Sequence, residues 1–313
     1  QPWSALREIT LAGFWPLDLE EERDASPFGT PPPRDSGSRS QLVRLLEALP
    51  NLRVAILSLY AHNADREDLA EFFGPNHAPP RSPRSFLRHL EVFQFPSLHS
   101  VDRILEILPP RLRTLSLPAY SQSLDSDNVE QPLLSPSDFV LMFGRVVFPD
   151  LEVLELQYAV DELAEADEEQ NLLALLPGKF PNLRKLTVTR IWVHKRAGLD
   201  ELWDPIPAYR TLLSKLPNLR MFRFNPDDPE RSGFTAFSTF GPPFMVYVER
   251  LRILGEAIVR DCPWLSEISL YREFRNDPDG FWEYWRVVSD PSGQVPVRLE
   301  GQRYPAWPGM VNS

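Results

Sequence analysis

Cysteine is nearly absent from the sequence. Cys262 is the single cysteine among 313 residues, and no Asn-x-Ser/Thr sequon occurs before the C-terminal tail. One cysteine excludes the intrachain disulfide framework that is typical of small secreted proteins. The sequence therefore favours a reducing compartment, the cytoplasm or the nucleus. It also predicts that Cys262, directly before Pro263, is a buried core thiol rather than a reactive one.

Long apolar runs are also missing. No run approaches the roughly 18 to 20 residues that span a bilayer, and no basic segment followed by an apolar one opens the chain. We therefore expect a soluble protein. The chain opens on Gln1 and the first repeat begins at Leu6, so we also expect the native protein to continue before Gln1.

Positive charge is in deficit. Lys and Arg total 33 against 44 Asp and Glu, which gives a net charge of −11. This balance argues against a nucleic-acid backbone as the main partner, because such proteins neutralise phosphates with clustered Lys and Arg.

The motifs of catalytic and metal sites do not occur in the sequence. There is no Gly-x-Ser-x-Gly, His-Glu-x-x-His, phosphate loop or Gly-x-Gly-x-x-Gly. We therefore expect no catalytic, cofactor-binding or metal-binding residues, and a protein that is not an enzyme. The histidines are scattered, without the spacing of a metal site: His62, His77, His89, His99 and His194.

What the chain does contain is one pattern repeated along its length, a proline followed by Leu-x-x-Leu-x-Val, as in residues 180–188. Repetition of this kind indicates stacked units that bury an apolar face against their neighbours. Eight copies are recognised, beginning at Leu6, Pro50, Leu87, Pro110, Pro149, Pro181, Pro217 and Pro263.

Helical spacing precedes several of these copies. The sequence predicts helices that end at a proline, which cannot continue a helix. Alternation of helix and strand predicts an α/β fold, an irregular leucine-rich-repeat solenoid with a curved parallel sheet and convex helices. The predicted helices span 40–49, 101–108, 163–176, 208–216 and 246–261.

Polar or proline-rich insertions separate the copies, and the repeats stop after Leu270. Residues 281–288 and 295–299 predict a β-hairpin that caps the open end, followed by a tail from Tyr304. The expected organisation is a solenoid over residues 1–275 and a hairpin cap and tail over 276–313. The main insertions are 18–40, 76–85, 119–136 and 226–243.

Alternate residues of each strand must share one face. The leucines of the pattern, such as Leu186, then form the core, and the residues between them line the concave surface, where solenoids commonly contact partners. We predict a protein partner on this surface. The predicted partner-binding residues are Arg88, Arg113, Glu155, Arg184, Lys185, Thr187, Arg220 and Arg223.

Five arginines follow the first leucine of a repeat and suggest a stripe that could grip an acidic peptide. The alternative is that they form ion pairs with Glu91, Glu152 and Glu155. His89 is expected on a strand beside Arg113 or Thr114, where it could make a pH-sensitive contact. The stripe would comprise Arg53, Arg88, Arg113, Arg184 and Arg220.

Two further groups have open roles. The acidic run 161–169 could dock a basic partner, but such runs usually form a solvated helix start. Large aromatic residues are expected in the core or the cap, although one or two could anchor a partner. They are Trp192, Trp203, Tyr209 and Trp285.

The copies, and Asp261–Leu270 above all, resemble the Cys-Pro-x-Leu-x-x-Leu-x-Leu units of leucine-rich-repeat proteins of the F-box type. Irregular repeats, acidic insertions and the aromatic hairpin look most like fungal F-box/leucine-rich-repeat proteins. The resemblance implies an F-box before Gln1 that binds Skp1 in a cullin-RING ubiquitin ligase, and repeats that present a substrate. The Asn or Cys expected eight positions after the first leucine is replaced by Tyr120, Ala159, Ile191, Asp227 and Glu273.

The sequence thus predicts a non-catalytic protein-interaction scaffold, the substrate-recognition repeats of an F-box-type ubiquitin-ligase receptor. Two alternatives stay open. One is a small-ligand binder or enzyme that uses the 226–243 insertion and the aromatic hairpin, and the other is a structural subunit of a larger assembly.

Overall fold

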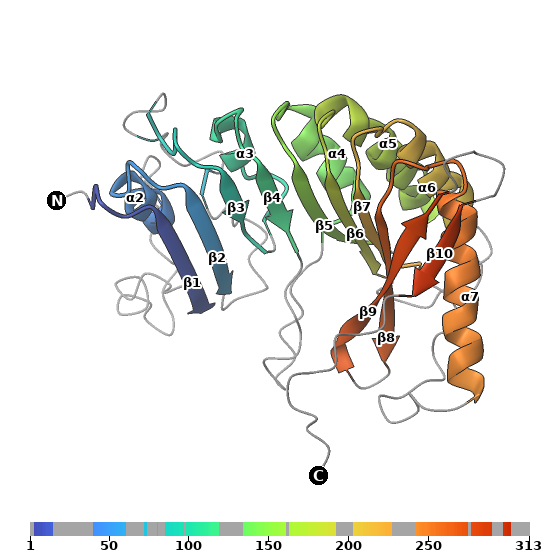
Figure 1. Cartoon of the computed structure of the whole chain (residues 1–313). Helices are drawn as coiled ribbons and strands as arrows, with labels where there is room; N and C mark the ends of the chain where they lie inside the picture. The colour runs from blue at the N-terminus through green and yellow to red at the C-terminus, as the bar shows by residue number, and fades with distance from the viewer. Residues whose placement is uncertain are drawn as a thin grey trace, which may run out of the picture.

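The computed structural model describes residues 3–14, 40–60, 72–73, 80, 85–96, 98–118, 134–160, 163–191, 203–226, 242–274, 277–289 and 297–301. Within these ranges, ten strands form one sheet in chain order (Figure 1). They are β1 (Glu8–Phe14), β2 (Val54–Tyr60), β3 (Val92–Gln94), β4 (Thr114–Leu117), β5 (Val153–Ala159), β6 (Lys185–Ile191), β7 (Met221–Phe224), β8 (Glu267–Phe274), β9 (Asp277–Val288) and β10 (Arg298–Gly301).

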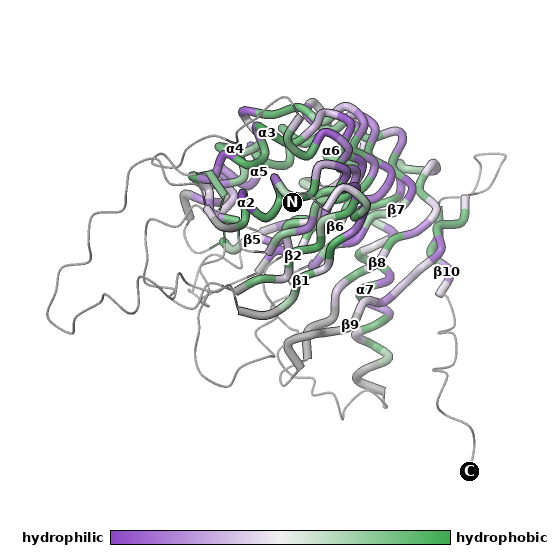
Figure 2. The backbone as a smooth tube through the Cα atoms, turned by 90° about the vertical axis from the view of Figure 1, so that its left-hand side faces the viewer, coloured by the Kyte–Doolittle hydropathy of each residue, from purple (hydrophilic) through white to green (hydrophobic). Residues whose placement is uncertain are grey.

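The first eight strands are all parallel, one for each predicted repeat. Parallel neighbours need a crossover connection, and the helices lie in these crossovers, most of them gathered on one side of the sheet (Figure 2). The result is the predicted α/β fold, a mostly parallel sheet of the leucine-rich-repeat-like solenoid type. The helices are α2 (Gln41–Glu47), α3 (Ile104–Ile107), α4 (Pro136–Gly144), α5 (Leu163–Lys179), α6 (Pro205–Ser214) and α7 (Pro242–Val259).

Helix α2 is capped at its N-terminus, since the Ser40 side chain accepts a hydrogen bond from the Val43 N–H. The α3 prediction was too long, because the helix covers only Ile104–Ile107. Helix α4 was missed. Ser135 and Asp138 form a capping box there, with Pro136 in the first turn.

Prolines were misjudged in three helices. Helices α6 and α7 begin at Pro205 and Pro242, earlier than predicted, because first-turn N–H groups have no intrahelical partner and proline is tolerated there. Helix α5 passes through Pro177 to Lys179. Its last turn continues because Phe180, which is fully buried, donates its N–H to the Leu176 carbonyl at 2.9 Å.

The core lies between the sheet and the helices. Leucines of successive repeats pair in register across neighbouring strands and are fully buried, which is worth roughly 1.5 to 3 kcal/mol for each such side chain. Continuous stacking of this kind joins the repeats into one cooperative core. The row runs Leu115, Leu154, Leu186, Phe222, Ile268.

The third repeat was predicted three residues out of register. Leu87 lies in a turn with a φ of 50°, and the leading leucine of the repeat is Leu90. Phe93 then pairs with Leu115 in the core row. The physical reason is the burial of Phe93 against Phe72, whose ring centroid lies 6.0 Å away, in a core position that leucine fills elsewhere.

The predicted C-terminal hairpin is confirmed between β9 and β10, which pair antiparallel from Val288 with Arg298 to Trp285 with Gly301. A second antiparallel pairing, β8 with β9, was not predicted and joins the hairpin to the solenoid as one sheet. Helix α7 packs closely on this end, since a Cβ added at Gly255 would lie 2.8 Å from Leu299 Cδ1. The boundary at residue 275 stays a prediction, as do the tail and most of the four insertions, which fall outside the described ranges.

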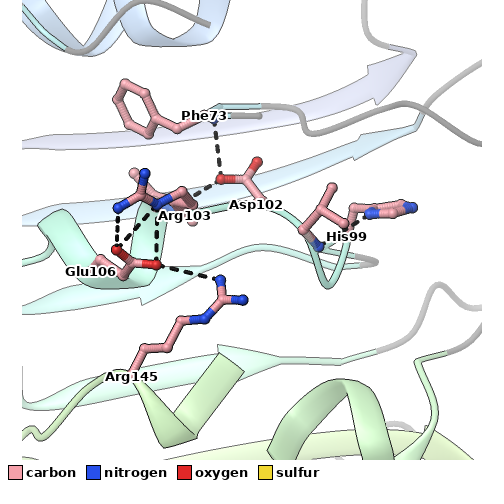
Figure 3. A network of polar contacts seen from close by, with 8 residues as sticks. Phe73, His99, Asp102, Arg103, Glu106 and Arg145 are labelled. Carbon is pink, nitrogen blue, oxygen red and sulfur yellow. Dashed lines mark hydrogen bonds and ion pairs between the residues drawn. The ribbon is translucent and has the colours of Figure 1, made fainter. Parts of the chain in front are cut away.

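Polar contacts also join neighbouring repeats on the helix side (Figure 3). The buried Asp102 carboxylate accepts backbone N–H groups of Phe72, Phe73 and Ile104 at 2.7, 3.1 and 2.9 Å. Burial raises the pKa of Asp102, and the three donors oppose that rise. Nearby, Glu106 accepts hydrogen bonds from Arg103 and from Arg145 of the next repeat.

Candidate functional site

The sheet face opposite the helices, here called the open face, carries the residues between the core leucines. One register row crosses it from β4 to β9 and is polar along its whole length, whereas the core row behind it is apolar. This contrast follows from strand alternation. The row comprises Ser116, Glu155, Thr187, Arg223, Ser269 and Tyr284.

Contacts along this row join neighbouring strands. The Ser116 hydroxyl donates to Glu155 at 2.5 Å. The Arg223 guanidinium lies over the Tyr284 ring, 5.2 Å from its centroid, and 3.7 Å from a Glu267 oxygen. These contacts link Ser116 with Glu155, and Arg223 with Tyr284 and Glu267, across neighbouring strands.

Lys185 lies on the same face as Thr187, two residues earlier in β6, and it is half-buried. Burial, together with the charge of Arg223, lowers the pKa of Lys185, and Glu155 and Glu267 oppose the change. The structure thus brings together four predicted residues, Glu155, Lys185, Thr187 and Arg223, on the open face.

Ser269 was missed by the sequence analysis. Its side chain is fully buried on the open-face side, and its hydroxyl has no hydrogen-bond partner among the described residues. The available signal was its position between the core residues Ile268 and Leu270, which directs it to the open face.

A second row, the edge row, lies just before the strands begin. Each member after the first donates its backbone N–H to the carbonyl of the preceding member at 2.7 to 2.9 Å. These bonds fix the side chains at the spacing of neighbouring strands, about 4.8 Å. The edge row runs Arg7, Arg53, Glu91, Arg113, Glu152, Arg184, Arg220, Ser266.

The predicted arginine stripe is thereby corrected. Arg53, Arg113, Arg184 and Arg220 do align, but Glu91 and Glu152 interrupt them, so the row alternates in charge from Arg53 to Arg184. Arg88 lies three residues earlier, in the turn over residues 85–89, because the register of the third repeat places Glu91 in the row.

The alternative of ion pairs is realised in part. Arg53 and Glu91 are 2.5 Å apart, and this contact lowers the pKa of Glu91. Arg184 reaches Glu152 only at 4.0 Å, and Arg220 donates to the Trp264 carbonyl at 2.9 Å. Both of these arginines are exposed.

A groove of about 710 Å³ follows the edge row across five successive repeats. Its lining is polar and carries both signs of charge, including Arg113, Glu152, Arg184 and Arg220. In the described part of the chain, Arg113 makes no ion pair or side-chain hydrogen bond. The groove therefore offers charged groups that a partner can engage.

Asparagines stabilise the groove wall. Asn182 donates its side-chain amide to the carbonyl of Pro149 at 2.9 Å, and Asn218 donates to that of Pro181 at 3.4 Å. These bonds connect each Pro-Asn-Leu turn with the turn before it. Asparagine contacts of this kind thus occur in the turns that lead into β6 and β7, rather than at the downstream position, where the sequence lacks asparagine.

His89 does not lie on a strand beside Arg113 or Thr114, as predicted. It lies in the turn before β3 and contacts two arginines, with Arg88 Nε 2.9 Å from its Nε2 and Arg111 Nη2 2.9 Å from its Nδ1.

The remaining candidates are structural. Cys262 is 2% exposed, and burial raises the pKa of its thiol to about 11. Tyr209 and Trp285 lie in the core as expected, and Trp203 packs against it and donates its indole N–H to the Pro226 carbonyl at 3.3 Å. Trp192 lies outside the described residues.

The acidic run is only partly a solvated helix start. Glu169, at its end, is 1% exposed and accepts hydrogen bonds from Tyr158 and from buried Arg190 at 2.6 and 2.9 Å. Arg190 also stacks on Trp203, 4.3 Å from the ring centroid. This carboxylate is therefore not available for docking.

In the described residues, no group of three or more His, Cys, Asp or Glu side chains lies close enough together to hold a metal ion. No helix in the same ranges is long and apolar enough to cross a membrane.

No protein-family model matches the chain, and no curated protein matches it. Among solved structures, the chain is similar to the leucine-rich repeat-containing protein LegL7 from Legionella pneumophila. The two share 13% sequence identity over 74% of this chain and 68% of the other, with a TM-score of 0.32. The leucine-rich-repeat-like character of the fold rests on the parallel sheet and its register.

Proposed function

We propose that the chain is a non-catalytic protein-interaction scaffold that binds a partner along the edge-row groove and the adjoining open face. The observation that supports this is the groove itself, into which five successive repeats each deliver charged side chains.

The geometry suits recognition of an extended protein segment. A segment that lies across the strands would meet Arg113, Glu152 and Arg184 in turn, at intervals of about 4.8 Å. Alternating charge at fixed spacing selects partners with the complementary alternation and opposes others. Exposed arginines provide forked donors that match carboxylates.

Charge reversal in the groove tests the scaffold. Wild-type protein and an Arg184→Glu/Arg220→Glu variant would be compared in quantitative enrichment from extract of the source cells, and binding of each enriched protein would then be measured by calorimetry after purification. We expect the variant to lose more than about tenfold in affinity, since two negative charges would then face the carboxylates of the partner that the arginines match. Its melting temperature should stay near that of the wild type.

A matched control reverses two cations on the helix side, Lys215→Glu/Arg260→Glu, where both side chains are exposed. This variant should bind as the wild type does. Equal loss of binding in both variants would show a dependence on net charge and would contradict a site in the groove.

A narrower proposal is that these repeats are the substrate-recognition part of an F-box-type ubiquitin-ligase receptor. Its support is the resemblance of the repeat motifs, and no residue described here carries the adaptor contact. Co-purification of the full-length protein with Skp1 and a cullin tests it. Absence of both, under conditions in which a known F-box protein recovers them, would reject the narrower proposal and leave the scaffold standing.

A further inference from the structure

A second hollow, of about 660 Å³, adjoins the groove at its β3 and β4 end. Arg111 lines both hollows and so connects them. The floor of the second hollow is apolar, with Phe86 and Leu108 almost fully buried, whereas Arg88 and His89 stand at its rim. This combination suits a segment that presents a polar group beside an apolar side chain.

The rim holds more hydrogen-bond donors than acceptors. A guanidinium has only N–H donors, and a neutral imidazole has one N–H and one acceptor nitrogen. Arg88 and Arg111 each approach a different nitrogen of the His89 ring at 2.9 Å. Only one of these contacts can be a hydrogen bond, because the other brings two N–H groups together. An anion that drew both arginines away from the ring would accept from both.

The surrounding charge favours an anion as well. Arg88 lies in the same turn as His89, Arg111 comes from the turn before β4, and Arg7 and Arg53 come from the turns before β1 and β2. Among the described carboxylates nearby, Glu91 is bonded to Arg53, and Asp150 lines the adjoining groove together with Arg111. Burial and then the four arginines lower the pKa of His89, so the ring is neutral in the free protein at neutral pH.

We propose that this hollow binds an acidic segment of a partner protein, with an Asp or Glu carboxylate between Arg88 and Arg111 and an apolar side chain on the floor formed by Phe86 and Leu108. The inference rests on the proposed scaffold function and assigns the chemistry of its partner. A peptide is favoured over nucleic acid because the floor is apolar and the chain carries a net charge of −11.

Binding should take up a proton at His89. In the free site, a protonated His89 ring would carry an N–H donor at both nitrogens. Each of these donors would face an arginine, which also has only donors. Once a carboxylate is present, the protonated ring can donate to it instead. Affinity should therefore increase as pH falls, by at most about tenfold per pH unit for one linked proton.

The test uses the full chain and a fluorescent eight-residue peptide of alternating Glu and Leu, measured by anisotropy at pH 8 and pH 6. Three comparison probes have the same length: a Lys-Leu peptide, a phosphoserine-Leu peptide and a single-stranded RNA. We expect the Glu-Leu peptide to bind, and to bind about fivefold more tightly at pH 6 than at pH 8. The Lys-Leu peptide and the RNA should not bind.

Variants locate the site. Arg88→Gln/Arg111→Gln should weaken the Glu-Leu peptide by at least about tenfold, whereas the control Lys215→Gln/Arg260→Gln should not. His89→Ala should bind within about twofold of wild type at pH 8 and lose the dependence on pH. Melting temperatures of all variants establish that each is folded.

Several results would overturn the proposal. They are no binding of the Glu-Leu peptide at millimolar concentration, equal binding by the Arg88→Gln/Arg111→Gln variant, a pH dependence that survives in His89→Ala, and a preference for RNA or for the phosphoserine peptide. If the Glu-Leu peptide fails while Arg184→Glu/Arg220→Glu still loses a natural partner, the acidic-segment site is rejected and the scaffold function stands.

Discussion

The two faces of strand β6 have different surroundings. Leu186 and Val188 are fully buried against the helices, whereas Lys185 and Thr187 lie among polar neighbours on the open face. The four residues are consecutive, so their surroundings differ only because strand side chains alternate. Apolar burial is concentrated on the helix side, and the open face carries the charge that we propose a partner recognises.

The same contrast separates two ion pairs. Arg190 and Glu169 are almost fully buried, whereas Arg53 and Glu91 are 56% and 34% exposed. Removing the carboxylate of a buried pair leaves the charge of its partner unpaired in the protein interior. Removing the carboxylate of an exposed pair costs little, because water solvates the cation that remains. Pairs of identical chemistry should therefore differ widely in what their removal costs.

The largest expected effect on stability comes from comparing these two ion pairs. Glu169→Ala leaves the Arg190 guanidinium without its carboxylate and removes the acceptor of the Tyr158 hydroxyl. We expect a loss of about 3 to 5 kcal/mol in the free energy of unfolding, measured by urea denaturation. The matched change Glu91→Ala should cost no more than about 1 kcal/mol. Similar losses of unfolding free energy in the two variants would contradict the expected difference between a buried and an exposed ion pair.

Next in size is the contrast within β6. Leu186→Ala opens a cavity in the core row and should cost about 2 to 5 kcal/mol in urea denaturation. Lys185→Ala, on the adjacent residue, should cost less than about 1 kcal/mol, since its side chain is half-buried on the other face. A larger loss for Lys185→Ala would show that the open face also contributes to the core.

A smaller effect concerns pH. The Arg53 contact lowers the pKa of Glu91 in the folded protein, so this carboxylate stabilises the fold above its unfolded pKa of about 4.5. That contribution is lost as pH falls through the lower, folded value. Arg53→Gln should remove this acid-dependent difference, of less than about 1 kcal/mol, and 1 M salt should screen it. An unchanged pH profile in Arg53→Gln would contradict the pairing.

The smallest effect should be on Cys262, which lies on the helix side. Burial and a thiol pKa of about 11 predict slow reaction with a disulfide reagent at pH 8 in the native protein, and a fast reaction in urea. This prediction concerns the reactivity of the thiol alone. A fast native reaction would show that this end of the core opens readily.

The strands could be predicted because their alternation is strict and repeated. The third repeat was misplaced because Leu87, Leu90 and Val92 imitate the motif, and only the burial of Phe93 and Phe95 decides between the two registers. Prolines misled the helix ends, since their effect depends on whether the N–H they lack would have had a partner.

The candidate site was predicted in its parts and not in its arrangement. Open-face positions such as Glu155 and Arg223 follow from alternation alone. The alternating charge of the edge row depends on the register of Glu91, and the hollow at His89 depends on how two turns from different repeats meet. Long-range placement of this kind is not encoded in local spacing.

The most direct test of a two-sided sheet measures unfolding free energy and partner affinity on the same two variants. Arg184→Glu/Arg220→Glu should lose partner binding and keep its unfolding free energy within about 1 kcal/mol of wild type. Leu186→Ala should lose stability and, at a temperature where it is folded, keep its affinity. A charge-reversed variant that unfolds, or one that binds the partner as the wild type does, would contradict the division of labour between the two faces.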